Sequence, residues 1–246
     1  MALMLRPFFS FYGGKWRAFR RYPTPSHDTI VEPFAGSAGY ATRYPDRQVD
    51  LYDADPIIAG VWDFLIHATE AEIRHLPLTF DHVDDLDLPA EARNLIGFWL
   101  NHGMNAPCKT PSAWMRAGTH NTSFWGEAIR ERIATQVGAI RHWTITNGQY
   151  DKAPNEMSTW FVDPPYTSPA GRRYRYDDRG IDFNVLGDWC QGRRGQVIVC
   201  EQAGATWLPF QSIGAFKSTK GQTSEVVWTG GRTRASTHTT GTRRTT

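Results

Sequence analysis

Short apolar runs alternate with amphipathic stretches along the chain, and this alternation predicts the fold. A helical pattern with one apolar face follows the second run, around Val61 and Trp62, and another covers residues 181–192. The expected strands cover residues 29–31, 48–52, 142–147, 159–166, 195–202 and 220–230, with residues 214–218 forming a hairpin with the last. Strands that are apolar on both faces and alternate with helices predict a doubly wound α/β sheet.

Residues 67–142 interrupt this alternation. The segment has helical and loop-like patterns and is too long for an ordinary crossover between two strands. We therefore expect a main domain built from residues 1–66 and 143–229, with residues 67–142 as an inserted, mainly helical subdomain. The low-complexity, basic segment 230–246 predicts a disordered tail.

Composition narrows the environment and the chemistry. The net charge of the 246 residues is only +2, so any basic surface must be local. Three scattered cysteines are typical of buried thiols in a reducing compartment. His67, His75 and His82 lie in a polar helical stretch, and no spacing indicates a metal site. No run reaches the length of a membrane span, and the first residues lack the layout of a signal peptide.

Three segments lie directly after predicted strands. They are "EPFAGSAG" at 32–39, "DAD" at 53–55 and "DPPY" at 163–166. Ligands of open α/β sheets bind outside the carboxyl ends of the strands. These three segments are therefore the candidate site.

The first segment is a turn rich in small residues. Gly36 and Gly39 allow the backbone to approach a ligand closely before a helix begins, but the spacing is not that of a dinucleotide fingerprint. Glu32 would repel a phosphate and suits a positively charged ligand such as a sulfonium or an amine. The alternative is a tight strand–helix connection with no ligand.

The second segment places acids at the end of a strand. Asp53 is positioned to accept hydrogen bonds from a ribose diol, as acids do in nucleotide folds. Asp55 is the second candidate. It can equally cap the helix that begins at Pro56.

The third segment is a rigid step. Two prolines fix their own φ angles and restrict Asp163 to an extended conformation. The step can hold a carboxylate and a carbonyl where both accept hydrogen bonds from an exocyclic NH2, with Tyr166 ready to stack on a flat ring. The alternative is an ordinary turn at the end of a strand.

Taken in order, "FYGGK", "EPFAGSAGY", "LYDADP", "DPPY" and "SEVVWTG" resemble the Dam-like DNA adenine-N6 methyltransferases. The resemblance implies a Rossmann-like class I fold, S-adenosylmethionine as cofactor, double-stranded DNA as partner and a cytoplasmic bacterial or phage-encoded enzyme. It assigns residues 67–142 to target recognition and Asp163, Pro164, Pro165 and Tyr166 to catalysis. It assigns cofactor binding to Tyr12, Gly13, Gly14, Lys15, Glu32, Pro33, Phe34, Ala35, Gly36, Asp53 and Asp163, with Gln149 or Tyr150 beside the cofactor's adenine.

Four arginines follow the rigid step in "GRRYRYDDRG". Mixed with tyrosines, Arg172, Arg173 and Arg175 suit phosphate contacts around a distorted DNA strand, but a solvated loop neutralised by neighbouring acids has the same composition. The rigid step would also serve a cytosine-N4 DNA methyltransferase or an RNA guanine-amine methyltransferase. A catalytically silent nucleic-acid-binding protein is the alternative from another class.

Overall fold

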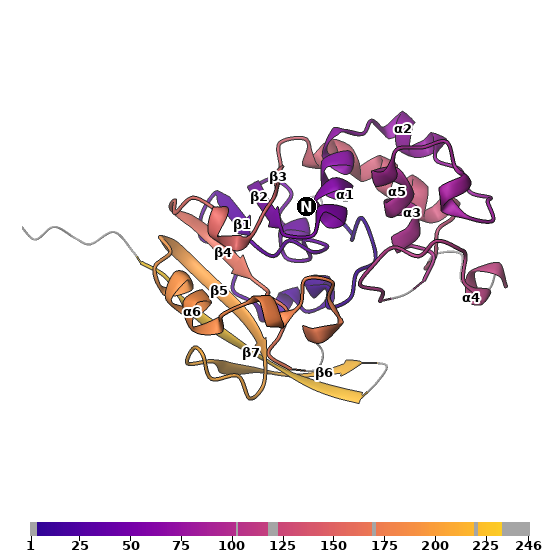
Figure 1. Cartoon of the computed structure of the whole chain (residues 1–246). Coiled ribbons are helices and arrows are strands. Elements are labelled where there is room, and N and C mark those ends of the chain that lie inside the picture. Colours follow the sequence, from indigo (N-terminus) through magenta and orange to yellow (C-terminus); the bar gives the residue numbers. More distant parts are fainter. Residues whose placement is uncertain (1–3, 102, 118–122, 169–170, 219–220, 233–246) are drawn as a thin grey trace, which may run out of the picture.

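The computed structural model describes residues 4–101, 103–117, 123–168, 171–218 and 221–232. Seven strands among these residues form one sheet in the order β3-β2-β1-β4-β5-β7-β6 (Figure 1). Their bounds are β1 Thr29–Glu32, β2 Gln48–Asp53, β3 Thr144–Asn147, β4 Ser158–Val162, β5 Gly195–Gln202, β6 Gln211–Ser218 and β7 Gly221–Gly230. The first five strands in this order are parallel, and β7 pairs antiparallel with both β5 and β6.

The parallel part has the 3-2-1-4-5 order of a Rossmann-like sheet. The predicted strands and the final hairpin are present, although the strand expected over 159–166 covers only Ser158–Val162, and the fold class is confirmed. Strand β4 ends at Val162, so "DPPY" begins the loop that follows it.

Alternate side chains of the central strands enter two separate hydrophobic clusters. Phe161 of β4 packs with Ile198 of β5 in one cluster, whereas their neighbours Trp160 and Val197 pack in the other. A strand with apolar residues on both faces must be covered on both sides. The continuous apolar runs in the sequence are the direct cause of this layered core.

Helices cover the two faces unequally. They are α1 Pro56–His67, α2 Glu70–His75, α3 Ala90–Phe98, α4 Ala113–Arg116, α5 Glu127–Val137 and α6 Phe183–Gln191. Helices α1, α2, α3 and α5 gather in one region of Figure 1, and α6 lies beside β5. Ile96 of α3 and Ile133 of α5 belong to the same cluster as Trp62 of α1. The described part of segment 67–142 is thus helical, and its core is continuous with that of the sheet.

The turn after β1 does not lead into an α-helix, so that prediction is wrong. A single 3₁₀ turn, Ala41–Arg43, takes the place of the expected helix. The physical reason is length: β2 begins at Gln48, and Pro45 interrupts the short connection. The face left open is filled from the N-terminal segment, where Phe8 and Phe9 are fully buried against Trp62.

Other predictions concern absent features and the tail. No helix in the described part of the chain is long and apolar enough to cross a membrane. Across the same residues, no group of three or more His, Cys, Asp or Glu side chains is arranged to hold a metal ion. Cys190 and Cys200 are buried free thiols, and Cys108 is half-buried. From residue 233 onward, the predicted basic tail lies outside the described residues.

Candidate active site

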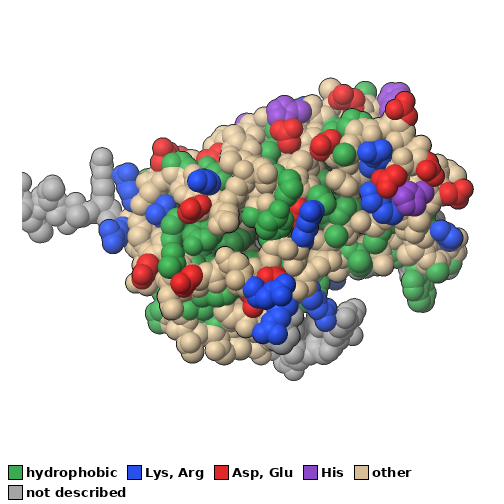
Figure 2. All heavy atoms as spheres, in the orientation of Figure 1, with side chains coloured by type: hydrophobic (Ala, Val, Ile, Leu, Met, Phe, Trp, Pro, Cys, Tyr) green, Lys and Arg blue, Asp and Glu red, His purple; other side chains and the backbone are tan. Residues whose placement is uncertain are grey.

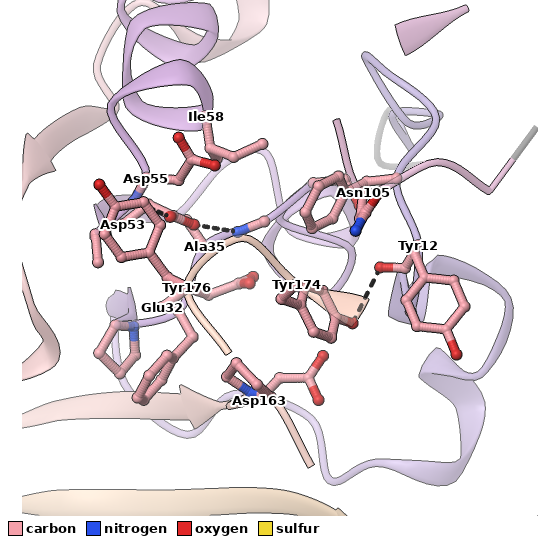
Figure 3. A pocket seen from close by; sticks show the side chains of 18 of the residues that line it. Tyr12, Glu32, Ala35, Asp53, Asp55, Ile58, Asn105, Asp163, Tyr174 and Tyr176 are labelled. Atoms are coloured by element: carbon pink, nitrogen blue, oxygen red, sulfur yellow. Dashed lines mark hydrogen bonds between the residues drawn. The ribbon is translucent and has the colours of Figure 1, made fainter. Parts of the chain in front are cut away.

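The sheet reverses its strand order between β1 and β4, and a pocket lies at this switch point. Glu32 ends β1, Asp53 ends β2 and Asp163 directly follows β4. All three acids line the pocket, which lies where open α/β sheets bind their ligands (Figure 3).

The pocket gathers most of the site residues predicted from the sequence. Those that line it are Tyr12, Gly13, Gly14, Lys15, Glu32, Pro33, Phe34, Ala35, Gly36, Asp53, Asp163, Pro165 and Arg175. Pro164 is buried and Tyr166 is half-buried, and neither is among the lining residues. Arg172 and Arg173 are exposed outside the pocket. The assigned role of each residue stays a prediction.

Asp53 holds the glycine turn in place. Its Oδ2 accepts a hydrogen bond from the Gly36 amide, and its Oδ1 accepts one from the Asp55 amide, both at 2.9 Å. Gly36 has a φ of +46°, which favours glycine at this position. Burial raises the pKa of Asp53 to about 6, although the two amide hydrogen bonds lower it. Asp55 caps α1 through the Ile57 amide, as the alternative interpretation of its sequence position held.

Glu32 stabilises the 3₁₀ turn that follows the glycine turn. Its side chain is 2% exposed, and its Oε1 accepts a hydrogen bond from the Ala41 amide at 2.6 Å. Burial raises the pKa of Glu32 to about 8, and the Ala41 amide only partly offsets this. At neutral pH the folded protein therefore keeps much of this carboxyl protonated. The role of Glu32 as a charge partner for a cationic ligand stays a prediction.

The raised pKa of Glu32 predicts a pH dependence of stability. Between the unfolded pKa near 4.5 and the folded pKa of about 8, the folded state binds more protons than the unfolded state. The contribution to the free energy of unfolding is therefore complete below the lower value and is lost as the pH rises through the higher one. Between about pH 5 and about pH 8, the free energy of unfolding measured with urea should fall less in Glu32→Gln than in the parent. The two decreases should differ by a few kcal/mol.

The control for this prediction is Asp46→Asn, which removes an exposed carboxylate. It should follow the parent across the same pH range. Parallel pH profiles for the parent and Glu32→Gln would contradict the buried, protonated state of Glu32.

Gly39 lets the N-terminal segment reach the site. A Cβ atom at this position would lie 2.7 Å from the Trp16 amide nitrogen and 2.8 Å from that of Lys15. The 3₁₀ turn Lys15–Arg17 therefore packs directly on the backbone of the glycine turn. This contact places Lys15 between the ends of β1 and β4.

Lys15 and Asp163 form a buried ion pair. Lys15 is 6% exposed, and its Nζ donates hydrogen bonds to Asp163 Oδ2 at 2.7 Å and to the Gly13 carbonyl at 2.8 Å. Burial lowers the pKa of Lys15, but the carboxylates of Asp163 and Glu225 outweigh that effect and raise it above its usual value. Burial raises the pKa of Asp163, which the Lys15 ammonium partly offsets. Asp163 Oδ1 is also buried and has no hydrogen-bond partner among the described residues.

Glu225 of β7 lies behind this pair. Its Oε2 accepts a hydrogen bond from the Tyr22 hydroxyl at 2.6 Å, and its Oε1 accepts one from the Tyr166 hydroxyl at 3.3 Å. Glu225 Oε1 is 3.9 Å from Lys15 Nζ, and that Nζ lies 4.9 Å from the centre of the Tyr166 ring. Glu225 was not among the predicted site residues, because "SEVVWTG" was interpreted as a strand and as one of the segments that resemble Dam-like enzymes, with no role for its glutamate.

The loop after "DPPY" folds back over the pocket. The Tyr174 hydroxyl donates to the Tyr12 carbonyl at 3.2 Å, and the two rings lie 5.6 Å apart (Figure 3). Tyr176 and Asn105 also line the pocket, and none of these three lining residues was predicted. The available signal for the tyrosines was their position in "RRYRY", directly after the predicted site segment "DPPY".

The far end of the pocket is aromatic. Phe34 stacks on Tyr150 with ring centres 5.5 Å apart and an angle of 24° between the rings. Gln149 and Tyr150 both line the pocket here, together with Ile181. A flat, apolar wall of this kind suits an adenine ring.

The arginines of this loop differ in their surroundings. Arg179 pairs with Asp177, as the solvated-loop alternative predicted. Arg175 lies 3.7 Å from Asp55 Oδ1, and Arg173 lies 5.5 Å from the centre of the Tyr12 ring. Arg172 and Arg173 form no salt bridge with a described residue. Figure 2 shows Lys and Arg side chains gathered below the middle of the face it presents.

Comparison with protein-family models and with curated proteins finds no match. Among solved structures, the chain is similar to an Escherichia coli protein described as a candidate methyltransferase, with 12% identity and a TM-score of 0.32, over 82% of this chain and 75% of that one. It is also similar to a Haemophilus influenzae protein described as a candidate methylase, with 10% identity and a TM-score of 0.35, over 83% and 80%. Similarity at this level carries no inference about substrate, and the Rossmann-like assignment rests on the strand order itself.

Proposed function

We propose that the protein transfers a methyl group from S-adenosylmethionine to the N6 amine of a flipped-out adenine in double-stranded DNA. The observation that carries this proposal is the meeting of distant segments in one pocket. The Gly-Gly-Lys segment, the glycine turn, Asp53, Asp163 and Pro165 all line it. These are the parts that the resemblance to Dam-like enzymes assigns to cofactor and amine binding, and they lie at the switch point of the sheet.

The residues fit S-adenosylmethionine. Asp53 uses each carboxylate oxygen once for a backbone amide, and a carboxylate has about four acceptor sites, so it retains capacity for two ribose hydroxyls. Phe34 and Tyr150 supply the flat wall for the adenine. The exposed backbone at Gly13 and Gly14 leaves room beside Lys15 for the methionine end. When bound, the cofactor supplies a methyl group already activated by its sulfonium.

Asp163 and its neighbours orient the target amine. The unpartnered Oδ1 of Asp163 and the Pro164 carbonyl can each accept one hydrogen of an NH2 group. Held this way, the nitrogen lone pair points away from both acceptors and toward the methyl carbon. The carboxylate also stabilises the positive charge that develops on the nitrogen, and it can accept the proton that the methylated amine then releases.

The substrate base must leave the DNA helix to reach this pocket, because its amine is inaccessible inside a duplex. The role we propose for the Tyr166 ring is to stack on the extruded base, as the resemblance to Dam-like enzymes implies. The exposed Arg172 and Arg173 lie on the loop that closes the pocket and can contact backbone phosphates beside it.

Incubation with labelled S-adenosylmethionine and a randomised DNA library, followed by nucleoside mass spectrometry, tests the proposal. We expect N6-methyladenine in DNA, within a defined sequence context. Methylcytosine in DNA, or methylguanine in a parallel RNA library, would instead show that the target is the exocyclic amine of another base. Failure to bind the cofactor in calorimetry would favour the silent nucleic-acid-binding protein.

The arginine loop predicts a specific salt dependence. Each phosphate contact contributes about 0.9 to the slope of log K against log salt concentration for duplex DNA. The double variant Arg172→Ala/Arg173→Ala should therefore flatten that slope by about one to two in a fluorescence binding assay. Arg47→Ala is the matched control. Arg47 lies just before β2, at the amino-terminal ends of the parallel strands and away from the pocket, and it pairs with Asp28. An unchanged slope in the double variant would show that these two arginines face solvent and do not contact phosphate.

A further inference from the structure

Lys15 already occupies the position that the resemblance assigns to the substrate. Its ammonium is held by Asp163 Oδ2 at 2.7 Å and lies 4.9 Å from the centre of the Tyr166 ring. An amine on a stacked base would take these same two neighbours. Stacked aromatic rings have centres about 4.5–7 Å apart, so the ammonium and a base cannot share this face of Tyr166.

A second carboxylate is available to receive this ammonium. Glu225 Oε1 is 3.9 Å from Lys15 Nζ, so a movement of about 1 Å brings the two atoms to ordinary hydrogen-bond distance. Oε1 lies beside the Tyr166 hydroxyl, at the edge of the ring. Moving from Asp163 toward Glu225 would therefore shift the ammonium toward the hydroxyl edge of the ring, and the flexible lysine side chain can then withdraw further from the face on which a base would stack.

The position of Glu225 is fixed independently of Lys15. Its Oε2 accepts the Tyr22 hydroxyl at 2.6 Å, and its side chain is 16% exposed. The backbone of β7 is paired with β5 at Glu225, opposite Gln202. Glu225 is thus a rigid acceptor, whereas Lys15 has a flexible side chain that can move between two acids.

We propose that Lys15 is an internal stand-in for the substrate amine, and that Glu225 is the positioning residue that receives its ammonium when the target base enters. This inference rests on the proposed function. In the free protein the lysine neutralises Asp163 and covers Tyr166. In the substrate complex it stays buried and charged beside Glu225, so that no unpaired ammonium is left in the pocket.

A spectroscopic measurement tests the resting pair on the protein alone. The chain has five lysines, so signals from lysines labelled with ¹³C at Cε can be resolved, and Lys15→Arg identifies that of Lys15. We expect the Lys15 signal to shift in Asp163→Asn, which neutralises its partner. An unchanged signal would overturn the resting pair, whatever the protein methylates.

A second measurement tests the transfer to Glu225. Glu225→Gln keeps an acceptor for Tyr22 but removes the charge that attracts Lys15. We expect kcat/KM for DNA to fall by about tenfold or more, the scale of a hydrogen bond to a charged group, while cofactor affinity is unchanged. Glu156→Gln, which neutralises an exposed glutamate outside the pocket, is the control and should stay within about twofold of the parent.

The double variant separates positioning from a structural role. If Glu225 acts by receiving Lys15, adding Glu225→Gln to Lys15→Met should change kcat/KM little, because the group it receives is gone. Equal losses in both backgrounds would make Glu225 a structural residue and overturn the transfer. Adding substrate DNA should also move the Lys15 signal in the parent and not in Glu225→Gln. A parent protein that methylates no nucleic acid contradicts the proposed function and the transfer together, and leaves the resting pair to be judged by the first measurement.

Discussion

Replacing Asp163 with asparagine should abolish nearly all methyl transfer while leaving cofactor binding largely intact. The substitution keeps the shape of the side chain but removes the negative charge that orients the amine and stabilises the developing cation. Loss of one such pre-oriented group costs about a hundredfold to a thousandfold in rate. Cofactor affinity should change much less, because Asp53, which we assign to the ribose, lies apart from Asp163 in the pocket (Figure 3).

Labelled-methyl incorporation and calorimetry measure these two effects separately. Asp163→Ala should behave in the same way and also removes the acceptor for Lys15. Asp188→Asn is the control, since Asp188 is an exposed acid on α6 outside the pocket. Turnover by Asp163→Asn equal to that of the parent would refute the assignment of this step to amine binding.

Adding one methyl group at Gly39 should disturb both stability and the site. The new Cβ would lie 2.7 Å and 2.8 Å from two backbone nitrogens of the Lys15–Trp16 segment, and backbone atoms cannot rotate away as a side chain can. Overpacking of this kind destabilises proteins by about 1–3 kcal/mol. Because the displaced segment carries Gly13, Gly14 and Lys15, we also expect cofactor affinity to fall about tenfold or more.

The matched control is Gly138→Ala. Gly138 follows α5 with a φ of −59°, and an added Cβ there meets no atom within 4 Å. This variant should be neutral or slightly more stable, by up to about 1 kcal/mol. Thermal unfolding of both variants measures the difference. Equal stability and equal cofactor affinity for the two would show that the N-terminal segment does not depend on its contact with Gly39.

Much of the fold could be predicted from local patterns. The apolar runs of β4 and β5 are buried on both faces, and only a covered, mainly parallel sheet satisfies them. The candidate pocket followed from one geometric rule, because Glu32, Asp53 and Asp163 all lie at the carboxyl ends of strands. The prediction of a helix after the glycine turn was wrong, because it did not account for the few residues available before β2 begins.

Contacts between distant residues were beyond these patterns. Lys15 and Asp163 are 148 positions apart, and their pairing requires both the reversal of strand order and the close approach at Gly39. The placement of Tyr174 depends on the loop after β4 folding back onto Tyr12. A local sequence pattern contains no information about either of these long-range contacts.

The sequence by itself determined the strands, the glycine turn and the acids at the strand ends, because these depend on the identity of neighbouring residues and on burial. Only the tertiary structure decided which charges meet. It placed a lysine against the acid that we assign to amine binding, and it brought Glu225 from the last strand to within 3.9 Å of that lysine. Electrostatic energies depend on distance and burial, and both are set by the packing of the whole chain.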